Sequence, residues 1–66
     1  MNLNKLIECE CWILKKLEET GGITGKTLLE EAREAGFNPG YVFEARRICE
    51  TRIKVTRYMG KMWWQL

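Results

Sequence analysis

The sequence predicts an α+β fold in which three helices are followed by a C-terminal β-hairpin. Residues 3–19 and 25–35 are rich in strong helix formers, and their apolar residues recur at spacings of three and four. The stretch GFNP, residues 36–39, contains a glycine that ends helices and an Asn-Pro pair that begins them. Beyond residue 52, β-branched and aromatic residues alternate with polar ones. These three observations predict the element order.

The first helix is expected over residues 3–19. Its apolar residues Leu6, Cys9, Ile13 and Leu17 share one face, which predicts the side that enters the core. The glycine pair at 21–22 ends this helix.

The second helix is expected over residues 25–35. Thr24 is placed to cap it, and Ile23 can enter the core beside the turn as a strand of one or two residues. Its predicted buried side chains are Leu28, Leu29 and Ala32.

A tight corner connects the second helix to the third. Gly36 is expected just past the helix end, Phe37 points inward, Asn38 caps the next helix and Pro39 occupies its first position. The third helix is expected over residues 39–50. The sequence predicts that Val42, Ala45 and Cys49 face inward, while Tyr41, Phe43, Glu44 and Arg47 project away.

The hairpin is expected over residues 53–66, with its turn at Met59-Gly60-Lys61. Trp63 and Trp64 are neighbours in the second strand. Because side chains alternate between the faces of a strand, one should enter the core and the other should be more exposed. The alternative is that the pair forms a stacking platform for single-stranded nucleic acid.

Composition limits the classes of function. Sixty-six residues make one domain, and a hydrophobic fraction of 45% is that of a globular chain. No apolar run has membrane-spanning length and no signal-peptide pattern begins the chain, so we expect a cytoplasmic protein. The odd number of cysteines, Cys9, Cys11 and Cys49, favours reduced thiols. With no histidine and no serine, we expect no catalysis, no metal site, no cofactor and no small-molecule substrate.

Charge is distributed unevenly along the chain. Residues 1–36 carry five lysines and arginines against seven glutamates, a net charge of −2. Residues 37–66 carry six against two, a net charge of +4, and every charged side chain after Glu50 is basic. A basic half on a nearly neutral chain indicates a surface turned toward a polyanion. A solvated cationic surface without a partner is the alternative.

The element order is that of a winged helix-turn-helix domain, with residues 39–50 as the recognition helix. The sequence also resembles a winged-helix module found at the C-terminus of phage- and plasmid-type replication ATPases and primases, and in small phage DNA-binding proteins. The resemblance covers residues 9–66. The matching positions are Trp12, Ile13 and Leu17, then Glu31, Ala32 and Gly36, then Ala45 and Arg46, and finally Lys54, Arg57, Gly60, Trp63, Trp64 and Leu66. The chain departs from the family at Tyr41, where the family has Thr, and at Glu44, where it has Arg or Lys.

The resemblance implies a non-catalytic phage or mobile-element protein that binds double-stranded DNA and acts in transcription or replication regulation. The third helix would enter the major groove, and the basic wing would contact the backbone. The predicted DNA-binding residues are Lys26, Asn38, Tyr41, Arg46, Arg47, Arg52, Lys54, Arg57 and Lys61. The alternative is a protein–protein interaction module on the same frame, such as a phage inhibitor or adaptor that binds a host protein.

The first helix carries a second set of apolar residues, Leu3, Ile7 and Leu14, on a different arc from its core face. We interpret them as a self-association surface that forms a homodimer, or as a contact for a host or phage protein. The alternative is a broad apolar stripe that fits a small bundle.

Overall fold

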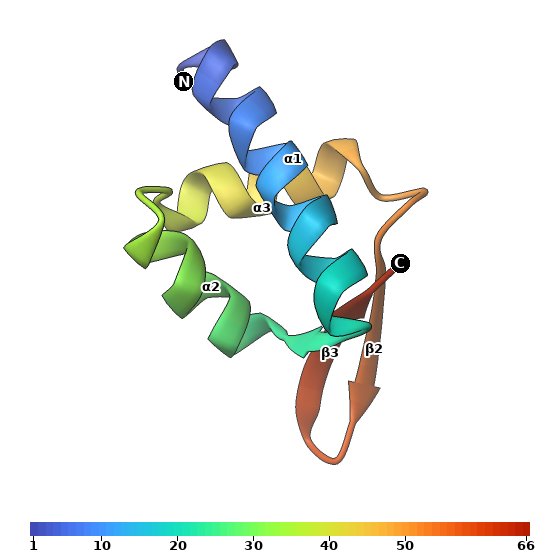
Figure 1. Cartoon of the computed structure of the whole chain (residues 1–66). Coiled ribbons are helices and arrows are strands. Elements are labelled where there is room, and N and C mark those ends of the chain that lie inside the picture. The colour runs from blue at the N-terminus through green and yellow to red at the C-terminus, as the bar shows by residue number, and fades with distance from the viewer.

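The structure is a computed structural model that describes all 66 residues. Its elements are α1 (Leu3–Thr20), β1 (Ile23–Thr24), α2 (Gly25–Glu34), α3 (Pro39–Ile48), β2 (Lys54–Tyr58) and β3 (Lys61–Gln65). The three strands form one antiparallel sheet in the order β1-β3-β2. In Figure 1 the helices lie together, the first turns of α1 extend past α3, and the β2–β3 hairpin projects at the other end. The α+β class and the helix order are confirmed.

The sheet has three strands rather than the two of the expected hairpin. Ile23 pairs with Trp64 and Thr24 pairs with Trp63, so β1 extends the hairpin through β3. The sequence expected at most a very short strand at Ile23, and β1 is indeed two residues long. Its pairing ties the beginning of α2 to the middle strand of the sheet.

Polar caps begin the three helices, as the sequence predicts for two of them. The side-chain oxygens of Asn2, Thr24 and Asn38 each accept a hydrogen bond from the backbone N–H three residues further on. At the other ends, Gly21 and Gly36 have φ angles of 73° and 95°, in the left-handed region. Glycine adopts this conformation without the penalty that a Cβ brings, so the two turns depend on it.

One cluster of buried hydrophobic residues forms the core. It consists of Leu6, Cys9, Ile13, Leu17, Ile23, Leu28, Ala32, Phe37, Val42, Ala45, Cys49, Ile53 and Trp64. The predicted inner faces of the first and third helices are therefore confirmed in full. Leu29 is only half-buried and packs at the edge of this cluster.

Two boundaries differ from the sequence expectation. Helix α3 ends at Ile48 rather than at Glu50, because the N–H groups of Arg52 and Ile53 both bond to the carbonyl of Cys49 and turn the chain toward β2. Lys61 belongs to β3, where it pairs with Tyr58, and not to the hairpin turn.

The hairpin turn consists of two residues, Met59 and Gly60, with φ angles of 53° and 76°. Two-residue turns with positive φ at both positions match the twist of the strands they join, so the register can continue to the last pair. No helix combines the length and the apolar character needed to cross a bilayer.

Candidate nucleic-acid interface

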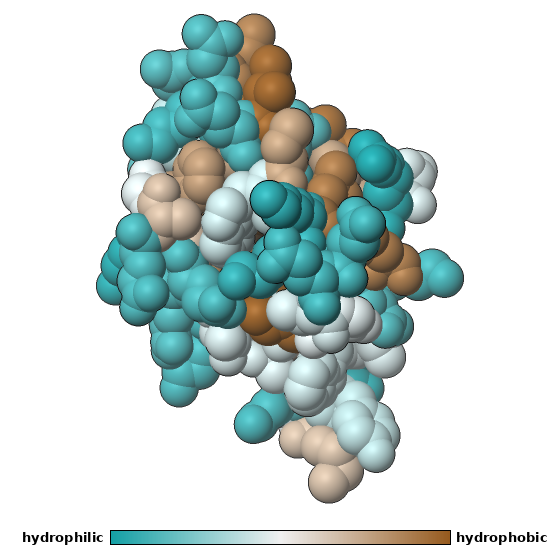
Figure 2. Space-filling model, viewed as in Figure 1, coloured by the Kyte–Doolittle hydropathy of each residue, from teal (hydrophilic) through white to brown (hydrophobic).

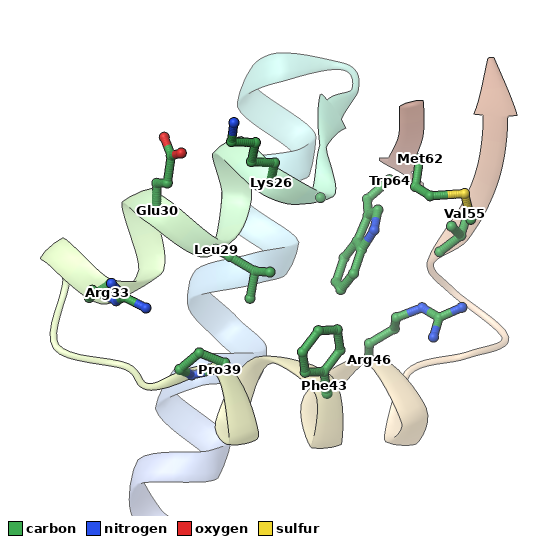
Figure 3. Close-up of a pocket in the computed structure, with 11 residues that line it drawn as sticks. Lys26, Leu29, Glu30, Arg33, Pro39, Phe43, Arg46, Val55, Met62 and Trp64 are labelled. Atoms are coloured by element: carbon green, nitrogen blue, oxygen red, sulfur yellow. The ribbon is translucent and has the colours of Figure 1, made fainter. Parts of the chain in front are cut away.

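A groove with a volume of about 650 Å³ lies between α2, α3 and the hairpin. Its walls come from three elements that are separated in the sequence, as Figure 3 shows. The helices contribute Gly25, Lys26, Leu29, Glu30, Arg33, Pro39, Phe43 and Arg46, and the strands contribute Val55, Met62 and Trp64. We call this hollow the groove throughout.

Three cations line the groove, and we call them the basic rim: Lys26, Arg33 and Arg46. Lys26 and Arg33 are seven residues apart on α2, so two helical turns bring them to the same side. Arg46 reaches the groove from α3. The one carboxylate of the lining is Glu30, which lies between the two α2 cations and leaves the groove with an excess of positive charge.

The floor of the groove is apolar and aromatic. Trp64 is 4% exposed and closes the bottom, and the ring of Phe43 lies 6.5 Å from it, centroid to centroid, at 56°. Phe43 itself is 50% exposed, and Met62 on β3 is 48% exposed. The guanidinium carbon of Arg46 lies 5.5 Å from the Trp64 ring centroid, a cation–π distance that holds this arginine over the floor.

The two neighbouring arginines of α3 have different surroundings. Arg46 turns into the groove, whereas Arg47 is exposed and forms an ion pair with Glu44 one turn earlier. The Arg47 Nε lies 3.2 Å from each carboxylate oxygen of Glu44. This hydrogen bonding lowers the pKa of the Glu44 carboxyl and raises the pKa of Arg47. The Arg47 charge is therefore partly neutralised on the outer surface of α3.

Tyr41 does not project from α3 into solvent as predicted. It is half-buried at the edge of the core, and its hydroxyl accepts a hydrogen bond of 3.0 Å from the backbone N–H of Asn2. This hydrogen bond joins the N-cap residue of α1 to the first turn of α3. Asn38 is exposed, but its side-chain oxygen is used as the cap that accepts from the Tyr41 N–H. Both residues therefore have structural roles.

The cations of the hairpin lie on both faces of the sheet. Residues paired across antiparallel strands point to the same side, and Arg57 is paired with Met62, which lines the groove. Lys54 is three residues before Arg57 on the same strand, and side chains alternate between the two faces of a strand. Lys54 and its partner Gln65 therefore point to the face opposite Arg57 and Met62. Lys61 also belongs to that opposite set by register, but it sits at the hairpin end and lines a smaller hollow with Lys26.

Arg52 is exposed in the turn between α3 and β2, outside the groove. Of the predicted DNA-binding residues, the structure thus brings Lys26, Arg46 and Arg57 to the groove side and leaves Arg47, Arg52 and Lys54 away from it.

Arg33 was not among the DNA-binding residues predicted from the sequence, although it lines the groove. Residues 26, 30 and 33 are spaced by four and three, so they lie on one side of α2. This spacing could have shown that Arg33 lies on the same side as Lys26. The role of Phe43 had no such signal, because its proximity to Trp64 depends on how α3 packs against the sheet.

The predicted self-association residues are exposed to different degrees. Leu3 and Ile7 are 67% and 48% exposed, and Figure 2 shows apolar surface gathered at this end of α1. Leu14 is different, because it is half-buried and packs against the core. Leu14 therefore does not share the exposed apolar surface of Leu3 and Ile7.

Comparisons with protein-family models, with curated proteins and with solved structures found no match for this chain.

Proposed function

We propose that this chain is a non-catalytic winged-helix protein that binds double-stranded DNA with its groove side. In this proposal α3 approaches the major groove, and the β2–β3 hairpin acts as the wing on the phosphate backbone. The order of helices and strands is compatible with such a wing, and the resemblance in the residue pattern supports the same frame.

The observation that carries the proposal is the convergence of cations from three elements on one side. Lys26 and Arg33 come from α2, Arg46 from α3 and Arg57 from β2, with Glu30 as the one acid among them. These residues are distant in the sequence, so their clustering is a property of the fold. Neutralising phosphates with lysine and arginine releases counterions, and this release supplies most of the non-specific affinity for DNA.

The beginning of α2 adds to this surface. Backbone N–H groups at a helix N-terminus favour anions, and Lys26 is in the first turn of α2. A phosphate placed there would meet both the free N–H groups and the lysine. The exposed side chain of Arg33 lies on the same stripe and extends the positive surface along the helix.

Fluorescence anisotropy with a short random-sequence duplex over a series of salt concentrations tests the proposal. We expect log-log plots with a slope of about −0.9 per phosphate contacted. The double variant Lys26→Glu/Arg33→Glu should lose binding, because two of the four positive charges on the groove side are reversed. Lys15→Glu is the matched control, since Lys15 is exposed on α1 and does not line the groove. If the wild type shows no duplex binding at low salt, the proposal fails.

A second candidate function is supported by the exposed apolar end of α1. Leu3 and Ile7 form an apolar surface without a partner in the chain, which suits a protein contact better than a DNA contact. In this alternative the chain is an interaction module, and the basic side is only a solvated surface. The alternative predicts no duplex binding at low salt, which the same anisotropy series detects.

A further inference from the structure

We propose that the groove takes one unpaired nucleotide, extruded from a DNA strand, with its base against Phe43 and its phosphate on the basic rim. This inference rests on the proposed DNA binding and deepens it, because it names the kind of DNA that the groove side would select. Fully paired DNA needs only the cations. The aromatic floor between the cations is suited to an unstacked base.

Exposed apolar side chains lie inside the basic rim. Phe43 and Met62 are both about half exposed, and they come from α3 and β3 on either side of Trp64. Exposed aromatic rings surrounded by cations are what proteins use to stack bases of unpaired strands, since every base has a π-face. The volume of about 650 Å³ is in the range of small-ligand sites.

The indole N–H of Trp64 is a hydrogen-bond donor without an acceptor in the chain. Trp64 as a whole is 4% exposed, and its indole N–H makes no hydrogen bond within the chain. The nitrogen lies beside Gly25 in the groove wall, where a Cβ would approach it to 2.9 Å. The absence of a side chain at Gly25 keeps this donor accessible to an acceptor on a ligand, and every nucleobase carries such acceptors.

The charge of the groove also suits a nucleotide. Lys26, Arg33 and Arg46 surround the apolar floor, so a ligand with an anionic group next to a flat ring matches the groove. Glu30 opposes a phosphate in its immediate vicinity, but its carboxylate can accept from an exocyclic amino group such as N4 of cytosine. A nucleotide combines ring, acceptor, amino group and phosphate in one unit. An acidic peptide with an aromatic residue would share the ring and the charge, but its benzene or phenol ring offers no acceptor at the edge comparable to a base carbonyl.

The test compares three labelled duplexes by fluorescence anisotropy at one fixed salt concentration. One is fully paired, one carries a single bulged cytosine, and one carries an abasic residue at the same bulge. The abasic duplex has the same backbone defect and flexibility but lacks the base. We expect the cytosine bulge to bind roughly tenfold more tightly than the abasic bulge, the size of one base–aromatic stack.

Two variants of Phe43 test whether the base is bound in the groove. Phe43→Leu keeps apolar contact with Trp64 but removes the ring, so the ratio between cytosine and abasic bulge should fall to about one. Phe43→Tyr keeps the ring and should keep the ratio. Circular dichroism confirms that each variant is folded.

Several outcomes overturn the inference. Equal affinity of the wild type for the two bulges means that the groove does not hold the base, while the proposed duplex binding stands. A preference that persists in Phe43→Leu places the base elsewhere. If no duplex binds at all, the proposed function fails and this inference fails with it. If an acidic aromatic peptide binds in a Phe43-dependent manner and the bulged DNA does not, the ligand is a protein.

Discussion

Gly25 and Trp64 pack so closely that a side chain at the first position of α2 would have to displace the indole ring. A Cβ built on Gly25 would lie 2.9 Å from Nε1 of Trp64 and 3.5 Å from Cε2. Trp64 cannot retreat easily, because it is buried in the core and its strand is hydrogen-bonded on both sides, to β1 and to β2. The contact joins the beginning of α2 to the floor of the groove.

Replacing Gly25 with alanine should therefore destabilise the fold, although glycine to alanine usually stabilises a helix. We expect Gly25→Ala to lower the free energy of unfolding by about 1–3 kcal/mol, the range for overpacked sites. Urea unfolding measures this. In a Trp64→Phe background the same change should cost less, because the smaller phenylalanine ring can shift away from the added methyl group more easily than the indole can. A rise in stability on Gly25→Ala would show that the contact relaxes freely.

Substitutions of Gly36 should also destabilise the fold, but for a different reason. It has a φ of 95°, yet an added Cβ would meet no atom within 4 Å. The cost of a substitution is thus backbone strain alone. Gly36→Val should lose more than about 1 kcal/mol in urea unfolding, and Gly36→Asn should lose less, because asparagine tolerates left-handed conformations better. Equal losses for valine and asparagine would contradict this explanation.

The two faces of the hairpin should contribute unequally to DNA binding. Arg57 shares the sheet face of Met62 on the groove side, whereas Lys54 points to the other face. We expect Arg57→Ala to weaken duplex binding and to reduce the salt slope by about one phosphate. Lys54→Ala removes the same charge from the opposite face and should change neither. Both variants are titrated against the same duplex. Equal effects would mean that the face on which a cation lies does not matter for binding and that only the total charge of the hairpin does.

The exposed end of α1 should mediate self-association. Burying Leu3 and Ile7 of two copies against one another removes apolar surface from water, at about 25 cal/mol per Å² before association costs. We expect sedimentation equilibrium to detect a dimer of the wild type and a monomer of Leu3→Lys/Ile7→Lys. Leu14→Lys is a poor test, because Leu14 packs against the core and its change would also lower stability. A wild type that stays monomeric at high micromolar concentration excludes the dimer.

The three thiols should differ in reactivity. Cys11 is exposed, whereas burial raises the pKa of Cys9 to about 11. Burial, followed by its hydrogen bond to Glu10, also raises the pKa of Cys49. A raised pKa leaves less thiolate at neutral pH, and the thiolate is the reactive form. Titration with a disulfide reagent at pH ~7 should show one fast thiol in the folded protein and all of them after unfolding. The fast phase should vanish in Cys11→Ala, and a second fast phase would indicate an open core.

The sequence by itself determined the local features of this fold. The buried face of α1, the caps at Thr24 and Asn38, the corner at Gly36 and the hairpin position all follow from residues within one or two turns of each other. Such features depend on helical period, on side chains that bond to a nearby backbone and on the freedom of glycine. Alternation along β3 also predicted that one of two adjacent tryptophans would be core.

The tertiary structure decided which tryptophan it was. Trp64 is the core residue because its cross-strand partners Ile23 and Val55 lie on the sheet face that meets the helices, while Trp63 is paired with Thr24 and Thr56 on the other face. Nothing within the strand distinguishes the two residues. The choice depends on register with strands distant in the sequence.

The candidate site was likewise only half visible in the sequence. The basic second half of the chain was evident, but not that Arg33 and Lys26 join Arg46 around one groove, nor that Arg47 is occupied by Glu44. Tyr41 was expected to face outward and instead bonds to the backbone of Asn2. These arrangements arise when helices pack side by side, because the direction of one helix sets which stripe of its neighbour is covered. Local sequence determines which side chains lie on each face of a helix, and only packing determines which residues they contact.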